Sequence, residues 1–285
     1  MYRLENYNRH KIDQCIQTAL DEDIITEDLS TNAIYDQGQK AQVDLLAKED
    51  GVLCGRYVFE RVFSLLDSQV QVDWALEEGA CFKKGDLLAK ISGDVRPILT
   101  GERTALNFLQ RLCGVASYTR DIVDQLEGSG IRLMDTRKTT PGLRLLQKYA
   151  VTVGGGKNHR TNLSDVIMLK DNHIQAAGGV GEAIQKAKSY APFVRTIVVE
   201  TENLDMVREA VENKASIIML DNMDRDQMEE AIGLIDGRCF VEVSGNVTRE
   251  SIRDLKGLKI DYISSGALTH SSGIIDLSMK NLRLL

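Results

Sequence analysis

The sequence predicts an α/β protein in two parts, a mixed α+β region followed by a parallel β/α barrel. In the first third of the chain, short apolar runs are separated by glycines, which is typical of strands and turns. Farther on, apolar strand candidates recur roughly every 20 to 35 residues with helical patterns between most of them, the spacing of βα units. Polar residues follow directly after each of these later candidates.

The first region extends from residue 1 to about 108 and opens with helical spacing over 8–20. An acidic segment, 21–30, is expected to be a loop. Apolar and polar residues then alternate in short runs, which predicts strands at 41–47, 70–74 and 87–91. A longer apolar period over 100–126 predicts one or two core helices.

The second region contains a series of apolar runs that we interpret as the strands of the barrel. They lie at 131–134, 166–169, 196–199, 216–220, 239–243 and 260–263. Helical patterns separate most of them, at 181–190, 204–213, 226–235 and 248–255. Because the carboxyl ends of barrel strands meet on one face, the residues after these strands should surround a single mouth.

The residues expected at this mouth are mainly cations. Position after a strand selects Arg137, Lys138, Lys170, Glu200, Asp221, Ser244 and Ser264. His159 and Arg160 add to the cationic set, as Lys157 could. Arginine pairs bidentately with carboxylate or phosphate, whereas lysine offers a compact charge. Since like charges gathered together destabilise a site without a ligand, we infer a ligand with several negative charges.

Glu200 and Asp221 end successive predicted strands and allow two interpretations. They could hold Mg²⁺, which takes one or two carboxylates together with substrate phosphates, or they could form salt bridges with the lysines opposite. Ser244-Gly245 and Ser264-Ser265-Gly266 follow the last two strands, where β/α barrels often bind phosphate. The histidines lack the spacing of a zinc site.

Composition narrows the class of protein. Lys and Arg total 35 against 42 Asp and Glu, a net charge of −7 that makes nucleic acid an unexpected partner. No apolar stretch approaches the ~18 residues of a membrane helix, so no membrane partner is expected. The cysteines are scattered and odd in number, and the N-terminus lacks a secretory pattern. We therefore expect a reducing, cytoplasmic location.

Two long segments, 135–160 and 165–174, closely resemble quinolinate phosphoribosyltransferase, the carboxylating nicotinate-nucleotide pyrophosphorylase family of NAD biosynthesis. Segments 101–112, 218–223 and 266–271 support the resemblance. It implies transfer of the phosphoribosyl group of phosphoribosyl pyrophosphate to quinolinate with decarboxylation, giving nicotinate mononucleotide, pyrophosphate and CO₂. It also implies Mg²⁺ as cofactor.

The resemblance further implies an N-terminal α/β sandwich at 1–108 and an incomplete, open β/α barrel at 109–275. We expect a C-terminal tail, 276–285, to pack back on the N-terminal domain. The expected assembly is a homodimer, or a higher even homo-oligomer, in which Arg103 reaches the partner's barrel mouth.

The family pattern also implies a role for each matching residue. By this resemblance, the residues that bind the quinolinate carboxylates are Arg103, Arg137, His159 and Arg160. Lys138 and Lys170 lie where the two substrates meet, and Glu200 and Asp221 lie near the ribose and Mg²⁺; we expect these four to be the catalytic residues. The residues expected to hold the 5-phosphate of the ribose are Ser244, Gly245 and Gly266, and Ser264 lies beside them. Asn246 and Ser265 depart from the family's phosphate loop.

Three alternatives stay open at this point. A related phosphoribosyltransferase could take a mono-acid, as the molybdate-operon paralogue of this fold does. A barrel aldolase could use Lys170 as a Schiff-base nucleophile. Finally, residues 78–93 resemble half of a biotinyl or lipoyl carrier, for which Lys48 is a weak candidate attachment site.

Overall fold

The computed structural model describes residues 9–245, 249 and 251–285. The chain forms two compact units. The N-terminal unit comprises Met1–Arg120, Thr140–Gly155 and Ser272–Leu285, and the barrel unit comprises Asp121–Thr139 and Gly156–Ser271. Among the described helices, none has the length and apolar character required to cross a membrane.

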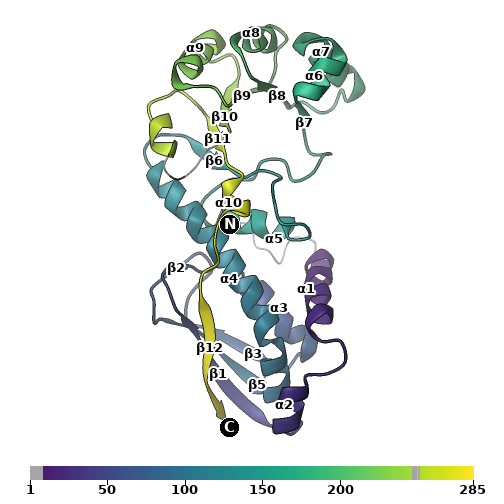
Figure 1. Ribbon diagram of the computed structural model, residues 1–285, viewed down its shortest axis with the longest axis vertical. Coiled ribbons are helices and arrows are strands. Elements are labelled where there is room, and N and C mark those ends of the chain that lie inside the picture. The colour runs from purple at the N-terminus through teal and green to yellow at the C-terminus, as the bar shows by residue number, and fades with distance from the viewer. Residues whose placement is uncertain (1–8, 246–248, 250) are drawn as a thin grey trace. The chain divides into compact units, whose positions relative to one another are not determined.

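The N-terminal unit is built on an antiparallel sheet of four strands in the order β12-β1-β5-β3 (Figure 1). Their bounds are β1 (Lys40–Ala47), β3 (Gln71–Trp74), β5 (Leu87–Asp94) and β12 (Leu277–Leu284). Alternate residues of β1 are buried, as the period-two pattern predicts, and the three strands predicted in this region are confirmed. A small pair, β2 (Gly51–Val52) and β4 (Cys81–Phe82), is antiparallel.

Helices cover this sheet, and one of them corrects the prediction. The helices of this unit are α1 (Arg9–Asp23), α2 (Leu29–Ile34), α3 (Arg56–Leu66), α4 (Val95–Gln125), which continues into the barrel unit, and α5 (Arg144–Val153). The acidic segment 21–30, expected to be a loop, contains the end of α1 and the start of α2. The Asp28 carboxylate accepts the Thr31 N–H at 3.0 Å and caps α2. The apolar period predicted as one or two helices is the single α4, since Pro97 lies in its first turn, where proline is tolerated.

Close backbone approaches in the N-terminal unit require glycine. A Cβ on Gly114 of α4 would lie 2.0 Å from the carbonyl oxygen of Gly273. A Cβ on Gly154, which ends α5, would lie 2.5 Å from the carbonyl oxygen of Ala116. The glycine run at the end of α5 therefore allows this helix to pack closely against α4.

The barrel unit contains a parallel sheet of six strands in the order β6-β11-β10-β9-β8-β7. Their bounds are β6 (Arg132–Met134), β7 (Ile167–Leu169), β8 (Ile197–Thr201), β9 (Ile217–Asp221), β10 (Phe240–Ser244) and β11 (Tyr262–Ser264). All six predicted strands are confirmed. The sheet is open, with β6 and β7 at its two ends, and Lys157 forms a single parallel bridge to Met134 beside β6.

Helices follow most of the barrel strands, in line with the expected βα units. They are α6 (Asp171–Ala177), α7 (Val180–Tyr190), α8 (Leu204–Glu212), α9 (Arg225–Ile235) and α10 (Ala267–His270). Figure 1 shows α7, α8 and α9 side by side along the outside of the sheet. The helix predicted at 248–255 lies partly outside the described residues, and its described part is the 3₁₀ helix η2 (Ser251–Leu255). Asn246 lies outside the described residues.

Candidate active site

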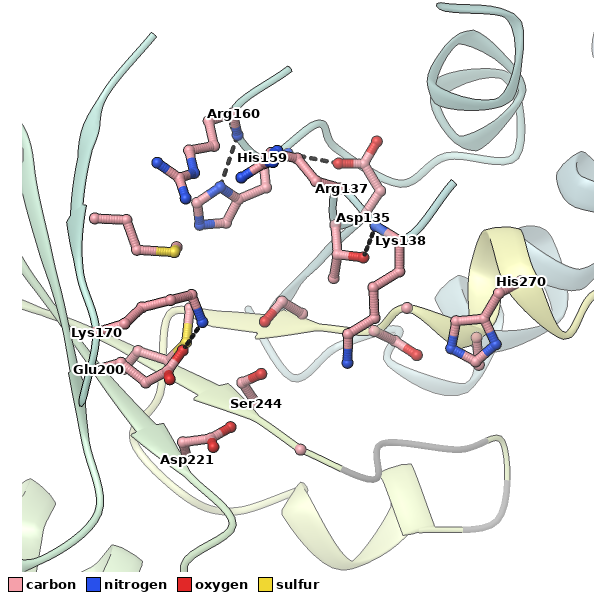
Figure 2. Close-up of a pocket in the computed structure, with 18 of the residues that line it drawn as sticks. Asp135, Arg137, Lys138, His159, Arg160, Lys170, Glu200, Asp221, Ser244 and His270 are labelled. Atoms are coloured by element: carbon pink, nitrogen blue, oxygen red, sulfur yellow. Dashed lines mark hydrogen bonds and ion pairs between the residues drawn. The ribbon is translucent and has the colours of Figure 1, made fainter. Parts of the chain in front are cut away.

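The carboxyl ends of the barrel strands surround a cavity of about 600 Å³ (Figure 2). The predicted site residues that line it are Arg137, Lys138, His159, Arg160, Lys170, Glu200, Asp221, Ser244, Gly245, Ser264 and Gly266. Arg103 is not among its lining residues. It lies on α4 in the N-terminal unit and lines a separate cavity of about 270 Å³ there.

A buried carboxylate joins the two segments that supply most of the cations. Asp135 follows β6 and has no exposed surface. Its Oδ1 accepts the His159 N–H at 2.8 Å, and its own N–H donates to the Lys157 carbonyl at 3.0 Å. The loop after β6, which carries Arg137 and Lys138, is thereby held beside the segment that carries His159 and Arg160.

Positive charge is concentrated on this wall of the cavity. Burial lowers the pKa of the Arg160 guanidinium from its ordinary value, and the neighbouring charge of Arg137 lowers it further. A protein rarely keeps two guanidinium groups close together and partly desolvated unless an anion compensates them. The wall is therefore suited to a ligand with carboxylate or phosphate groups.

Two lysines extend toward the cavity from opposite sides in Figure 2. Lys138 comes from the loop after β6, and Lys170 follows β7 and precedes α6. The Lys170 ammonium forms an ion pair with the Glu200 carboxylate, which is one of the two interpretations left open for the carboxylates. Because an ammonium engaged in an ion pair presents no lone pair to a carbonyl carbon, this contact disfavours Lys170 as a Schiff-base nucleophile.

The second interpretation, a metal site, is also compatible with the carboxylates. Glu200 is in register with Met219, two residues before Asp221, so side-chain alternation directs both carboxylates to the same face of the sheet. Within the described chain no cluster of three or more His, Cys, Asp or Glu could hold a metal ion. Two carboxylates on one face are compatible with Mg²⁺ only if further oxygens come from substrate and water.

The loops after β10 and β11 have the small residues expected of a phosphate site. Gly245 has a φ of 94°, and a Cβ there would lie 2.2 Å from Asn222 Oδ1, so only glycine suits this position. Ser264 is buried and lines the cavity, and its hydroxyl has no hydrogen-bond partner within the described chain. An unpartnered hydroxyl at the cavity wall is suited to a ligand oxygen.

Sequence reasoning did not single out Glu242, which lies in the middle of β10 and is 1% exposed. The sequence did contain an indication of it, because burying a glutamate within an apolar strand costs free energy unless the carboxyl group has a polar partner or a function. Glu242 Oε2 lies 3.4 Å from Nε2 of His159.

The fold and the site together define an α/β protein with an open parallel barrel whose mouth is lined by arginine, lysine and carboxylate side chains. Residues 28–113 match the description "Quinolinate phosphoribosyl transferase, N-terminal domain", and residues 115–280 match "Quinolinate phosphoribosyl transferase, C-terminal domain". The chain belongs to this family, an enzyme family of phosphoribosyltransferases.

Curated relatives and solved structures agree with this assignment. The chain is 43% identical to the "Probable nicotinate-nucleotide pyrophosphorylase [carboxylating]" of Bacillus subtilis, over 90% of this chain and 89% of the relative. The crystal structure of NadC from Streptococcus pyogenes is 52% identical, with a TM-score of 0.95 and coverage of 98% and 99% of the two chains. The nicotinate-nucleotide pyrophosphorylase structure from Francisella tularensis is 35% identical, with a TM-score of 0.93 and full coverage of both chains.

Proposed function

We propose that this protein transfers the phosphoribosyl group of phosphoribosyl pyrophosphate to quinolinate and decarboxylates the product to nicotinate mononucleotide. The observation that carries the proposal is the convergence of Arg137, Lys138, Arg160 and Lys170 on one cavity that also contains a carboxylate pair. Quinolinate has two carboxylates and the ribose donor is a polyanion, so both substrates need such a cationic cavity.

The residues divide into four groups in this proposal. Arg137 and Arg160 bind the quinolinate carboxylates, with His159 beside them. Lys138 and Lys170 lie between the substrates, and Glu200 and Asp221 face the ribose. The group proposed for the 5-phosphate is Ser244, Gly245, Ser264 and Gly266.

The reaction needs alignment and charge neutralisation rather than a general base for the first step. The lone pair of the ring nitrogen attacks the anomeric carbon of the ribose while the bond from that carbon to the pyrophosphate oxygen breaks. Lys138 and Lys170 neutralise the negative charge that develops on the leaving group. When CO₂ leaves, its bonding electron pair stays on the ring carbon beside the nitrogen, where the positive charge of the quaternary nitrogen stabilises it. A proton then bonds to that carbon in place of the carboxyl group.

Mg²⁺ is proposed at Glu200 and Asp221, where it would neutralise pyrophosphate charge when bound. In the structure, one of these two carboxylates, Glu200, forms an ion pair with Lys170. Binding of the donor would compete for this pair, because the pyrophosphate oxygens attract the same ammonium.

The direct test combines purified protein with quinolinate, phosphoribosyl pyrophosphate and Mg²⁺ and measures nicotinate mononucleotide and CO₂. We expect one CO₂ for each nucleotide formed. Activity with nicotinate and none with quinolinate would overturn the substrate assignment in favour of a mono-acid enzyme. Trapping of a carbonyl compound on Lys170 by borohydride would favour the aldolase alternative.

We also propose a homodimer in the cytoplasm, in which Arg103 completes the partner's site. Support comes from the location of Arg103 outside the lining of the barrel cavity and, for the compartment, from the five free cysteines.

Mixing two inactive variants tests the shared site. When one chain carries Arg103→Ala and its partner carries Lys138→Ala, a shared-site heterodimer has both substitutions in one active site. Its other active site is intact. Mixed and re-equilibrated variants should then recover about a quarter of the wild-type activity. Each variant alone is the control, and no recovery on mixing would contradict a shared site.

A further inference from the structure

Both ring nitrogens of His159 face groups of the protein. The side chain is 8% exposed, although it lies at the cavity wall. Its Nδ1 accepts the backbone N–H of Arg160 at 2.6 Å, and its Nε2 lies 3.4 Å from Glu242 Oε2. Figure 2 shows the first of these contacts as a dashed line between the ring and the Arg160 backbone.

These contacts define the form of the imidazole. A backbone N–H can only donate, so Nδ1 must present a lone pair to Arg160. The neutral ring then carries its proton on Nε2, directed at the Glu242 carboxylate. In this form the ring offers no positive charge to a substrate carboxylate.

The contacts also hold the backbone that presents Arg160. Asp135 Oδ1 accepts the His159 N–H at 2.8 Å, and the imidazole accepts the next N–H along the chain. Two consecutive backbone donors are therefore satisfied by side chains that lie in the barrel unit. The pair of contacts fixes the backbone from which the Arg160 guanidinium extends, and the guanidinium itself donates to the Val166 carbonyl at 3.4 Å.

Glu242 has a buried carboxyl group that the proposed reaction does not otherwise use. Its side chain is 1% exposed, and its Oε1 has no hydrogen-bond partner within the described residues. It also lines a second cavity, of about 650 Å³, together with His159 and Arg160. A buried carboxylate with an unpartnered oxygen destabilises the fold, so its presence beside the imidazole calls for a role at the site.

We propose that Glu242 and His159 form a positioning pair that orients Arg160 toward the ring carboxylates of quinolinate, and that His159 is not itself a ligand of those carboxylates. This inference rests on the proposed function. Within the described residues Nε2 has no hydrogen-bond partner, so the pairing requires the 3.4 Å separation from Glu242 Oε2 to shorten by about half an ångström when a ligand binds. The pair acts through the backbone of Arg160 and touches no reacting atom.

Two substitutions of His159 separate the positioning role from direct binding. In His159→Asn the side-chain oxygen can take the place of Nδ1 and accept the Arg160 N–H, whereas His159→Ala removes the acceptor. We expect the KM for quinolinate to rise by about tenfold or more in His159→Ala but by less than about threefold in His159→Asn. Equal losses in the two variants would overturn the proposal, because they would mean that the imidazole itself binds substrate.

Substitution of the glutamate tests the other half of the pair. Glu242→Gln keeps the shape but removes the charge that faces Nε2, and we expect the KM for quinolinate to rise about tenfold with smaller changes in kcat and in the KM for the ribose donor. The matched control is Val243→Ala on the same strand, also buried, which should lower stability and leave the KM for quinolinate unchanged. If both variants change this KM alike, the effect of Glu242 is structural only and the proposal fails.

Nitrogen-15 spectroscopy of the wild-type protein without substrate tests the geometry independently of activity. The chain has four histidines, and the His159→Asn variant identifies the signal of interest. We expect a neutral ring with the proton on Nε2. A charged ring or an Nδ1–H tautomer would overturn the pairing even if the enzyme is active, whereas failure of quinolinate turnover would count against the proposed function alone.

Discussion

The N-terminal unit and the cavity wall of the barrel unit use charged residues for different purposes. In the N-terminal unit, cations lie next to carboxylates, as in the partly buried pair Arg61–Asp13 at 2.7 Å and the exposed pair Lys83–Asp50 at 2.8 Å. The helices of the barrel unit carry such pairs as well, among them Arg225–Glu229 at 3.0 Å. At the cavity wall, by contrast, Arg137 lies close enough to Arg160 to lower its pKa. Neighbouring opposite charges stabilise a fold slightly, whereas neighbouring like charges lower its stability and raise its affinity for anions.

The largest expected effect is the loss of activity when a lysine of the barrel cavity is removed. The same substitution of a lysine in the N-terminal unit serves as the control. Lys138→Ala removes a cavity lysine and should lower kcat about 100- to 1,000-fold, since one donor to developing charge is worth that much. The midpoint of thermal unfolding should hardly change. Steady-state kinetics and calorimetry measure the two quantities.

The control for this experiment is Lys83→Ala, which removes an exposed cation of the N-terminal unit. We expect wild-type kcat in this variant. A similar loss of activity in both variants would mean that charge is not used differently in the two units.

The next largest effect concerns backbone packing. Gly114→Ala would place a methyl group 2.0 Å from the Gly273 carbonyl oxygen, so one of the two segments must move. We expect the free energy of unfolding to fall by about 3 kcal/mol, measured by urea denaturation.

Gly233→Ala in α9 is the matched control because its added Cβ meets no atom within 4 Å. Alanine is the better helix former, so stability should rise by up to about 1 kcal/mol. Destabilisation of similar size in both variants would show that glycine matters for helix conformation rather than for the close approach.

The smallest effect is a pH dependence in the N-terminal unit. The hydrogen bond from Arg61 holds the pKa of Asp13 below its usual 3.8. The pair therefore stabilises the fold at pH values above 3.8 and loses this contribution as the pH falls through the lower pKa of the folded state. We expect Asp13→Asn to lower stability by about 0.5 to 1 kcal/mol at pH 7.

The difference between wild type and Asp13→Asn should disappear in strongly acidic solution. Urea denaturation of the two proteins across the acidic range measures it. A difference that is constant with pH would show that packing, and not the ion pair, is responsible.

Much of the barrel could be predicted because its strands are apolar, short and evenly separated. The residue after each strand was predictable for the same reason, and Lys138, Lys170 and Asp221 lie at the cavity as expected. The start of α2 was missed because its capping residue, Asp28, lies in a segment whose acidic composition resembles a loop. No helix was predicted where α5 lies, and the close packing of Gly154 against Ala116 of α4 depends on contacts between distant segments that no local pattern shows.

The sequence by itself determined which residue types stand at the strand ends, since that follows from periods of two and 3.6 residues along the chain. Only the tertiary structure decided which of them interact. Lys170 with Glu200 and His159 with Glu242 are separated by 30 and 83 positions and meet because parallel strands bring distant segments to one edge. Burial, and with it the lowered pKa of Arg160, likewise depends on what surrounds a group in space, which no local pattern specifies.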